Sequence, residues 1–460
     1  MATGAVLCLV TVMTVSARVR FLVVFVGGLL VFQSEGVGAT KFAYLAAAIL
    51  AVSLSLVRLG RSREPLVMAF RPLLPASVSL ILVLGASAFV ARGAGASMTN
   101  WFRDVLPYFL VALLPAVGLD AAQDLSRKHA ERLLVVAGSV ASVGFAIDWL
   151  NRRGVSALGL GRIVLATTTL AALGFAYTIT KAGLGPHRLR WLMAASAIMT
   201  VMLVNGSRTN VVLLAATLGV VGSRAKVRVP FRRIVVLILQ LGAAVTITLP
   251  FLAAALIREP DFIGQRISGV VNVITGQATA DQSYMARQQS YALARQTFLH
   301  FPLFGIGPGH LYATEGFYSM SLDTPWLMPA KLGLIGVTAI VIYLLATAAC
   351  VRRVRKLAGW STLVTVGRGW AAFLVALIPF GPWIEDKGFA LALTLYVAVL
   401  VATSREALAA QKAQNAPEYV PAVDSLVGGR LHAPQVVAPS RMTRQRQPHA
   451  VASLQSRSGR

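Results

Sequence analysis

Residues of types that bind phosphate or move protons gather in the middle of the chain. Gly305, Gly307 and Gly309 alternate in the stretch HFPLFGIGPGHLYA (residues 300–313), and His300 and His310 flank them. Arginines recur over the preceding part of the chain: Arg208, Arg258, Arg266, Arg287 and Arg295. A guanidinium group presents a planar fork of N–H donors that matches the oxygens of a phosphate. The pattern therefore predicts a site for a phosphate-bearing ligand beside a glycine-rich turn.

The elements that must position these residues are membrane-spanning helices. The chain is 56% hydrophobic and only 13% charged, which is too apolar for a soluble fold. A span needs roughly 20 apolar residues. We expect an all-α polytopic protein with about twelve spans. They lie near residues 21–33, 41–57, 73–90, 104–119, 132–150, 162–180, 190–204, 209–222, 232–257, 326–350, 362–380 and 388–403.

Basic residues predict the orientation of these spans, because Lys and Arg beside a span stay preferentially in the cytoplasm. The loops richest in Lys and Arg include residues 58–71, 126–132 and 351–360, so we expect them in the cytoplasm together with the C-terminal tail. Residues 33–41, 91–104 and 381–388 then lie outside. The predicted organisation is N-terminal helices (1–257), a large external loop (258–325), C-terminal helices (326–403) and a disordered basic cytoplasmic tail (404–460). Residues 1–16 are expected to form a first half-helix rather than a cleaved signal peptide.

The long external loop is expected to contain a helix. Asp281 is a candidate N-cap, and no helix breaker follows until Pro302. Arg287, Tyr291 and Arg295 would lie on one face of that helix. Gly305 to Gly309 would then turn the chain back towards the membrane.

Several other classes of site are absent from the pattern. The net charge of +26 is explained by basic loops facing anionic lipid, so we expect no nucleic-acid binding. Cys8 and Cys350 stand far apart without metal-binding spacing, and no nucleotide-binding motif occurs, so neither a metal nor a cofactor is expected. Carboxylates within spans, the sign of a coupled transporter, are scarce, and Asp148 is the clearest.

The arginines have two interpretations. Arg208 enters a span from outside, where an unpartnered charge is costly, and this favours a functional role. Alternatively, the arginines contact lipid headgroups or pair with Glu259, Asp261 and Asp281. A non-catalytic membrane scaffold would be consistent with the second interpretation.

The order of motifs resembles the O-antigen ligase and polymerase-like membrane family over roughly residues 195–345. The segments are NGSRTNVVLLAATLGVV, then ARQQSYALARQTFLHFPLFGIGPG, then LDTPWLMPAKLGLIGVTAIVIYLL. The family shows a Ser-Arg at the start of a span, an Arg followed by an aromatic residue, a P-L-x-G-x-G turn and a Gly-x-x-Gly run entering the next span. The resemblance implies a bacterial cytoplasmic-membrane glycosyltransferase. It would move or polymerise a glycan from an undecaprenyl-pyrophosphate carrier to the hydroxyl of an acceptor glycan or glycolipid on the outer face.

The resemblance also implies roles for particular residues. Arg208 and Arg287 match the family's arginines and would bind the pyrophosphate, with Arg266 and Arg295 nearby. Preorganised cations stabilise a departing pyrophosphate without a metal. The position of the general base departs from the family pattern, because Leu322 stands where the family often has His or Asp. Asp323 and His310 are both candidates. Lys331 replaces a frequently acidic position, which favours a polymerase-like or divergent enzyme over a strict ligase. The alternative is a transporter of a lipid-linked glycan or small solute.

Overall fold

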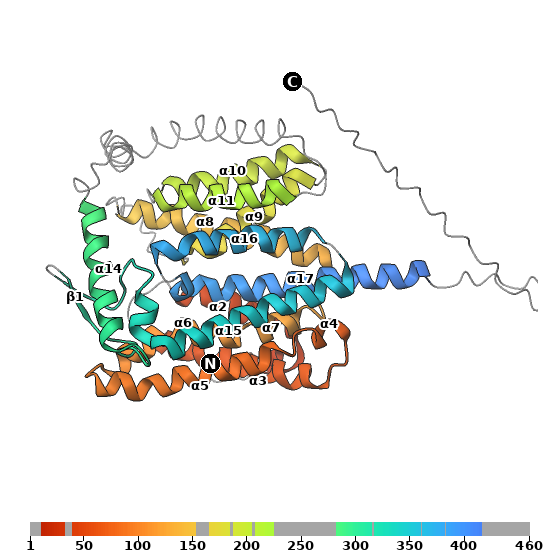
Figure 1. Cartoon of the computed structure of the whole chain (residues 1–460). Coiled ribbons are helices and arrows are strands. Elements are labelled where there is room, and N and C mark those ends of the chain that lie inside the picture. The colour runs from red at the N-terminus through yellow and green to blue at the C-terminus, as the bar shows by residue number, and fades with distance from the viewer. Residues whose placement is uncertain are drawn as a thin grey trace, which may run out of the picture. The chain divides into compact units, whose positions relative to one another are not determined.

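The computed structural model describes most of the residues up to 415, in nine segments. They are residues 11–32, 39–152, 165–184, 187–204, 208–224, 282–314, 317–359, 361–381 and 383–415. Almost all regular structure in them is helical (Figure 1). The predicted span at 232–257, the tail beyond residue 415, and Cys8 lie outside the described residues.

Among the described residues, seven helical segments are long and apolar enough to cross a membrane. They comprise α3 (Ala39–Arg61), α5 (Leu73–Gly93), α6 (Met98–Leu113) with α7 (Pro115–Ala121), α8 (Arg127–Arg152), α15 (Leu327–Ala358), α16 (Thr362–Leu377) continued by η3 (Ile378–Phe380), and α17 (Lys387–Asn415). The chain is therefore a helical membrane protein. All seven coincide with predicted spans.

Four further predicted spans are helices of only 15 or 17 residues. These are α2 (Ala17–Val31), α9 (Thr168–Leu184), α10 (Arg188–Val204) and α11 (Arg208–Arg224). The short α4 (Pro65–Met68) lies in a loop. Residues 11–15 are also helical and end at Ser16, whose hydroxyl accepts a hydrogen bond from the backbone N–H of Val19 and so caps α2.

Helix α17 lies at the centre of the packing, since nearly all its residues from Phe389 to Ala402 are buried. Small residues let neighbouring helices approach it closely. A Cβ at Gly28 of α2 would meet Leu391, one at Gly118 of α7 would meet the backbone of Thr394, and one at Gly367 of α16 would meet Tyr396. Close approach at small residues is the usual means of packing helices in membranes.

The external-loop region contains the expected helix and an unexpected hairpin. Helix α14 (Gln282–His300) covers the predicted segment, while Asp281 lies just outside the described residues. The hairpin pairs β1 (Tyr312–Thr314) with β2 (Phe317–Ser319) in antiparallel register, Ala313 opposite Tyr318. These strands are too short to leave a clear alternating pattern in the sequence.

The boundary of the predicted tail was also wrong, because α17 continues past residue 404 to Asn415.

Candidate functional site: a charged cavity at one end of the helices

The glycine turn completes a broken helix. Helix α15 is interrupted at Gly333, whose φ is 61°. The backbone groups freed by this break bond to the turn. Ile306 N–H donates to the carbonyl oxygen of Ala330 at 2.8 Å, and Gly307 N–H donates to that of Lys331 at 3.0 Å. Irregular backbone inside a membrane protein is tolerated where neighbouring protein satisfies its polar groups, so the turn and the break form one structural unit.

The three glycines of the turn are required by their backbone and by their neighbours. Gly305, Gly307 and Gly309 have φ values of 71°, 94° and 81°, which are unfavourable for other residues. A Cβ at Gly309 would lie 2.3 Å from the backbone nitrogen of Trp101, and one at Gly307 would lie 2.5 Å from the Cα of Ala91. Besides the role predicted for it, which was to redirect the chain, the turn packs directly on α5 and α6.

A buried cluster of charges lies directly beside this turn. Lys331, in the second turn of α15, is 1% exposed, and its amine donates to Asp104 Oδ1 at 2.7 Å and to Glu385 Oε1 at 2.9 Å. The second oxygen of Asp104 accepts from Gly309 N–H at 2.7 Å, and Tyr108 OH donates to Glu385 Oε1 at 2.9 Å. One amine thus links α6, α15 and η4 (Trp383–Glu385) to the glycine turn.

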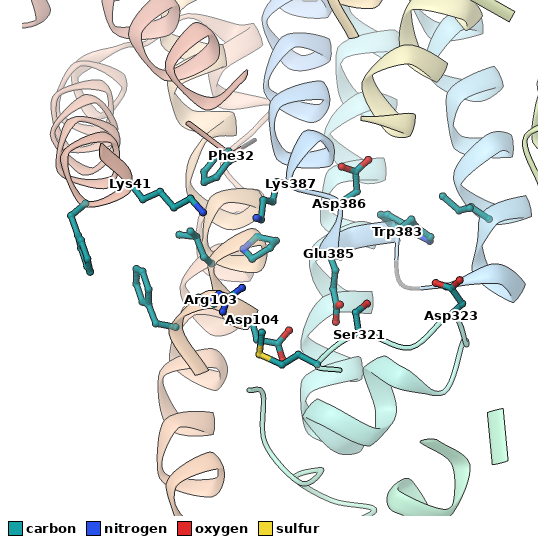
Figure 2. A pocket seen from close by; sticks show the side chains of 17 residues that line it. Phe32, Lys41, Arg103, Asp104, Ser321, Asp323, Trp383, Glu385, Asp386 and Lys387 are labelled. Atoms are coloured by element: carbon teal, nitrogen blue, oxygen red, sulfur yellow. The ribbon is translucent and has the colours of Figure 1, made fainter. Parts of the chain in front are cut away.

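Asp104 and Glu385 also form part of the wall of a cavity of about 460 Å³ (Figure 2). Its lining comes from segments far apart in the sequence. They are the end of α2, the starts of α3 and α17, the middle of α6, the end of α16, and the residues Met320, Ser321, Asp323, Gly381, Trp383, Glu385 and Asp386. Most of these segments belong to loops or span ends that were expected on one side of the membrane.

Basic side chains line the cavity together with these carboxylates. Lys41, Arg103 and Lys387 come from three different helices, and in Figure 2 they lie near one another on the side of α3 and α6. The Lys387 amine also lies 5.8 Å from the ring centroid of Phe32. Asp323 is seen on the other side, beyond Ser321 and Glu385.

Three of the four lining carboxylates are already bonded within the protein. Asp104 and Glu385 share the amine of Lys331. Asp386 Oδ2 accepts from the hydroxyls of Thr167 and Thr169 and from the N–H of Thr169, and its Oδ1 accepts from Gly388 N–H. Asp323, by contrast, is an exposed carboxylate. The arrangement separates a group of cations from an exposed carboxylate across one cavity, as an anion site beside a proton acceptor would require.

Burial shifts the pKa of two groups at the cavity end of the helices. The pKa of the Glu385 carboxyl is raised by burial and by the charge of Asp104, although Lys331 and Tyr108 counteract this. Burial lowers the pKa of His310, whose ring packs edge-on against Tyr312 with centroids 5.0 Å apart. The Tyr312 hydroxyl is buried and has no hydrogen-bond partner in the described part of the chain.

The residues proposed from sequence are only partly brought together. Asp323 lines the cavity, whereas Arg287 and His310 do not. Arg287 and Arg295 are exposed on α14. Arg208 is the first residue of α11, but its side chain, like the whole of Arg258 and Arg266, lies outside the described residues.

The expectation that carboxylates are nearly absent from the spans was wrong. Asp104 and Asp120 are buried in α6 and α7, and Glu131 of α8 bonds to Lys181 at 2.9 Å. They were overlooked because each lies near a predicted span end. The cationic partners of Asp104 and Asp120 are also distant in sequence, as with Asp104 and Lys331. Lys331 and Glu385 were also missed as site residues. The only available signal was their charge beside apolar runs.

Among the described residues, no three His, Cys, Asp or Glu side chains are grouped so that they could hold a metal ion. Comparison with known proteins gave no matching family model and no matching curated protein. The cavity and the motifs of the sequence are therefore the features that bear on function.

Proposed function

We propose that the protein is a membrane glycosyltransferase of the O-antigen ligase and polymerase-like type. It would transfer or polymerise a glycan from an undecaprenyl-pyrophosphate carrier to an acceptor hydroxyl, without a metal or cofactor. The observation that carries the proposal is the cavity with a cation group on one side and exposed Asp323 on the other. Loss of a pyrophosphate leaves negative charge that preorganised cations stabilise, and the acceptor hydroxyl needs a base.

The proposed location is the bacterial cytoplasmic membrane, with the cavity open on its outer face. The distribution of basic residues supports this orientation. Arg58 and Arg127 belong to loops that were predicted to be cytoplasmic, and both contact chain segments that do not line the cavity. Arg58 bonds to Asp124 at 2.8 Å, and Arg127 N–H donates to Glu406 at the end of α17. Lys41 and Arg58 stand in the first and last turns of α3, so the two groups lie at opposite ends of one helix.

Asp323 is the proposed general base. The test is glycan transfer by purified protein supplied with a lipid-linked glycan, comparing the wild type with Asp323→Asn. We expect the rate to fall by about 10² to 10⁴-fold, the usual contribution of a general base. Ser321→Ala, in the same segment of the cavity wall, is the matched control and should retain most activity. His310→Gln should be milder than Asp323→Asn. Near-normal transfer by Asp323→Asn would exclude it as the base.

The second candidate is a transporter of a lipid-linked glycan or small solute. Asp104 and Lys331, which are buried in membrane-spanning helices, favour it, because intramembrane charges often mark a translocation path. Reconstituted vesicles discriminate between the two functions. A transporter moves labelled glycan lipid between leaflets without changing it, whereas the enzyme lengthens or transfers the glycan.

A further inference from the structure

The cavity is lined by aromatic side chains beside its cations. Phe42 and Phe102 both line it, and their rings are stacked with centroids 6.2 Å apart. Phe42 is 56% exposed and begins a row on α3 that continues with Ile49 and Leu56, each seven residues further on. Residues at this spacing share one face of a helix. An exposed apolar face on a membrane-spanning helix faces lipid, so the cavity meets the lipid-facing surface at Phe42.

Three cations line the same cavity as this aromatic pair. Lys41 is next to Phe42, Arg103 is next to Phe102, and Lys387 begins α17. Lys41 and Lys387 are in the first turns of their helices, where the helix dipole disfavours positive charge. An anion bound here would relieve that repulsion. Each of the three residues also has an interaction within the protein.

We propose that the cavity admits a lipid diphosphate sideways from the membrane. Lys41, Arg103 and Lys387 bind the diphosphate oxygens, and Phe42 and Phe102 contact the first part of the lipid chain. Three cations match the multiple charges of a diphosphate better than the single charge of a phosphodiester lipid. This assignment deepens the proposed function, and rests on it for the chemistry after binding. It differs from the pyrophosphate site expected at Arg208 and Arg287.

The test measures binding by the full chain in lipid nanodiscs, with undecaprenyl diphosphate as the probe. Undecaprenol, phosphatidylglycerol and inorganic pyrophosphate are compared with it. We expect undecaprenyl diphosphate to bind most tightly, because the other three lack the diphosphate or the lipid chain. Phosphatidylglycerol binding equally tightly through the same residues would overturn the assignment to a diphosphate.

Variants then locate the site. Lys41→Ala, Arg103→Ala and Lys387→Ala should each weaken binding of the diphosphate lipid by about tenfold, as expected for a lost charge-assisted hydrogen bond. Lys41→Arg and Lys387→Arg, which keep the charge, should recover most of the affinity and show that the variants fold. Arg92→Ala is the matched control, since Arg92 is exposed at the end of α5 and does not line the cavity. Normal binding by all three alanine variants, or loss of binding in Arg287→Ala alone, would overturn the inference.

The two proposals can fail separately. If the wild type binds undecaprenyl diphosphate through the three cations but never transfers glycan, the proposed function is wrong and the site stands. If glycan is transferred and the cavity variants bind the diphosphate lipid normally, the function stands and the site is elsewhere.

Discussion

Charged side chains are buried at both ends of α3, but their surroundings differ. At the cavity end, Asp104 and Glu385 share a single cation, the amine of Lys331. At the other end, Asp120 is completely buried, with several donors. Arg20 Nε lies 3.0 Å and Ser55 Oγ lies 2.9 Å from its Oδ2.

A further cation supports Asp120 from the side of its other oxygen. Arg58 Nη1 is 3.4 Å from Asp120 Oδ1, close enough for an ion pair, although this oxygen has no hydrogen bond. A buried ion pair is therefore not in itself a sign of function. Asp120 has two cations and joins α2, α3 and α7, whereas Asp104 and Glu385 share one cation and line a cavity.

The largest expected effect on stability comes from removing the central cation at each end of α3, which is Lys331 at the cavity end and Arg20 at the other. Lys331→Met leaves two buried carboxylates without a cation, and we expect a loss of about 3–5 kcal/mol in the free energy of unfolding. Arg20→Met should cost less, because Asp120 keeps Ser55 and Arg58. Denaturant unfolding of both variants in detergent measures the difference.

The control for this comparison neutralises the whole cavity cluster. Adding Asp104→Asn and Glu385→Gln to Lys331→Met removes the stranded charges and should recover much of the lost stability. If Arg20→Met were as destabilising as Lys331→Met, the number of cations at each end would not determine how costly the loss of one cation is.

A smaller effect is expected at the glycine turn. Gly309→Ala combines an unfavourable φ with a Cβ 2.3 Å from the Trp101 backbone, and it also disturbs the bond to Asp104. We expect a loss of about 3 kcal/mol in the free energy of unfolding. Gly95→Ala is the matched control, because Gly95 has φ +80° but no neighbour within 4 Å of the added Cβ, and it should lose only about 1 kcal/mol. Equal losses of stability would show that packing of the turn on α6 contributes little.

Much of the helical architecture could be predicted from the sequence, because apolar runs and helix length are local properties. Helix α14 also followed from local signals, as did the position of the glycine turn before a span. The break at Gly333 was not predicted, since its backbone groups are satisfied by the turn around Gly305, which is distant in sequence.

The site was predicted less well than the fold. Asp323 was identified and lies at the cavity, but only through a family resemblance. In the sequence, Lys331 is only a departure from the family pattern, whereas its position between Asp104 and Glu385 follows from the packing of α6, α15 and η4. Pairs formed between distant helices leave no pattern in one sequence, so Lys41, Arg103 and Lys387 could not be grouped before the structure was known.

The smallest expected effect is on the pH dependence of stability, which should have opposite directions at the two ends of α3. Burial raises the pKa of Glu385 above the ordinary 4.5, so the folded protein binds this proton more tightly than the unfolded chain does. The contribution of Glu385 to stability is therefore complete below pH 4.5 and decreases as pH rises towards its folded pKa. The hydrogen bond from Arg58 lowers the pKa of Asp124 below the ordinary 3.8. Its contribution is present above pH 3.8 and is lost as pH falls through its folded pKa.

The melting temperatures of wild type, Glu385→Gln and Asp124→Asn across this pH range measure both contributions. The glutamine variant should gain stability relative to wild type as pH rises from 4.5, because glutamine resembles the protonated acid. The asparagine variant should be less stable than wild type at neutral pH and approach it on acidification. If the melting temperatures of both variants, relative to wild type, changed with pH in the same direction, the attraction of Lys331 for the Glu385 carboxylate would outweigh the cost of burying it. The cavity cluster would then be a stabilising ion network like that around Asp120.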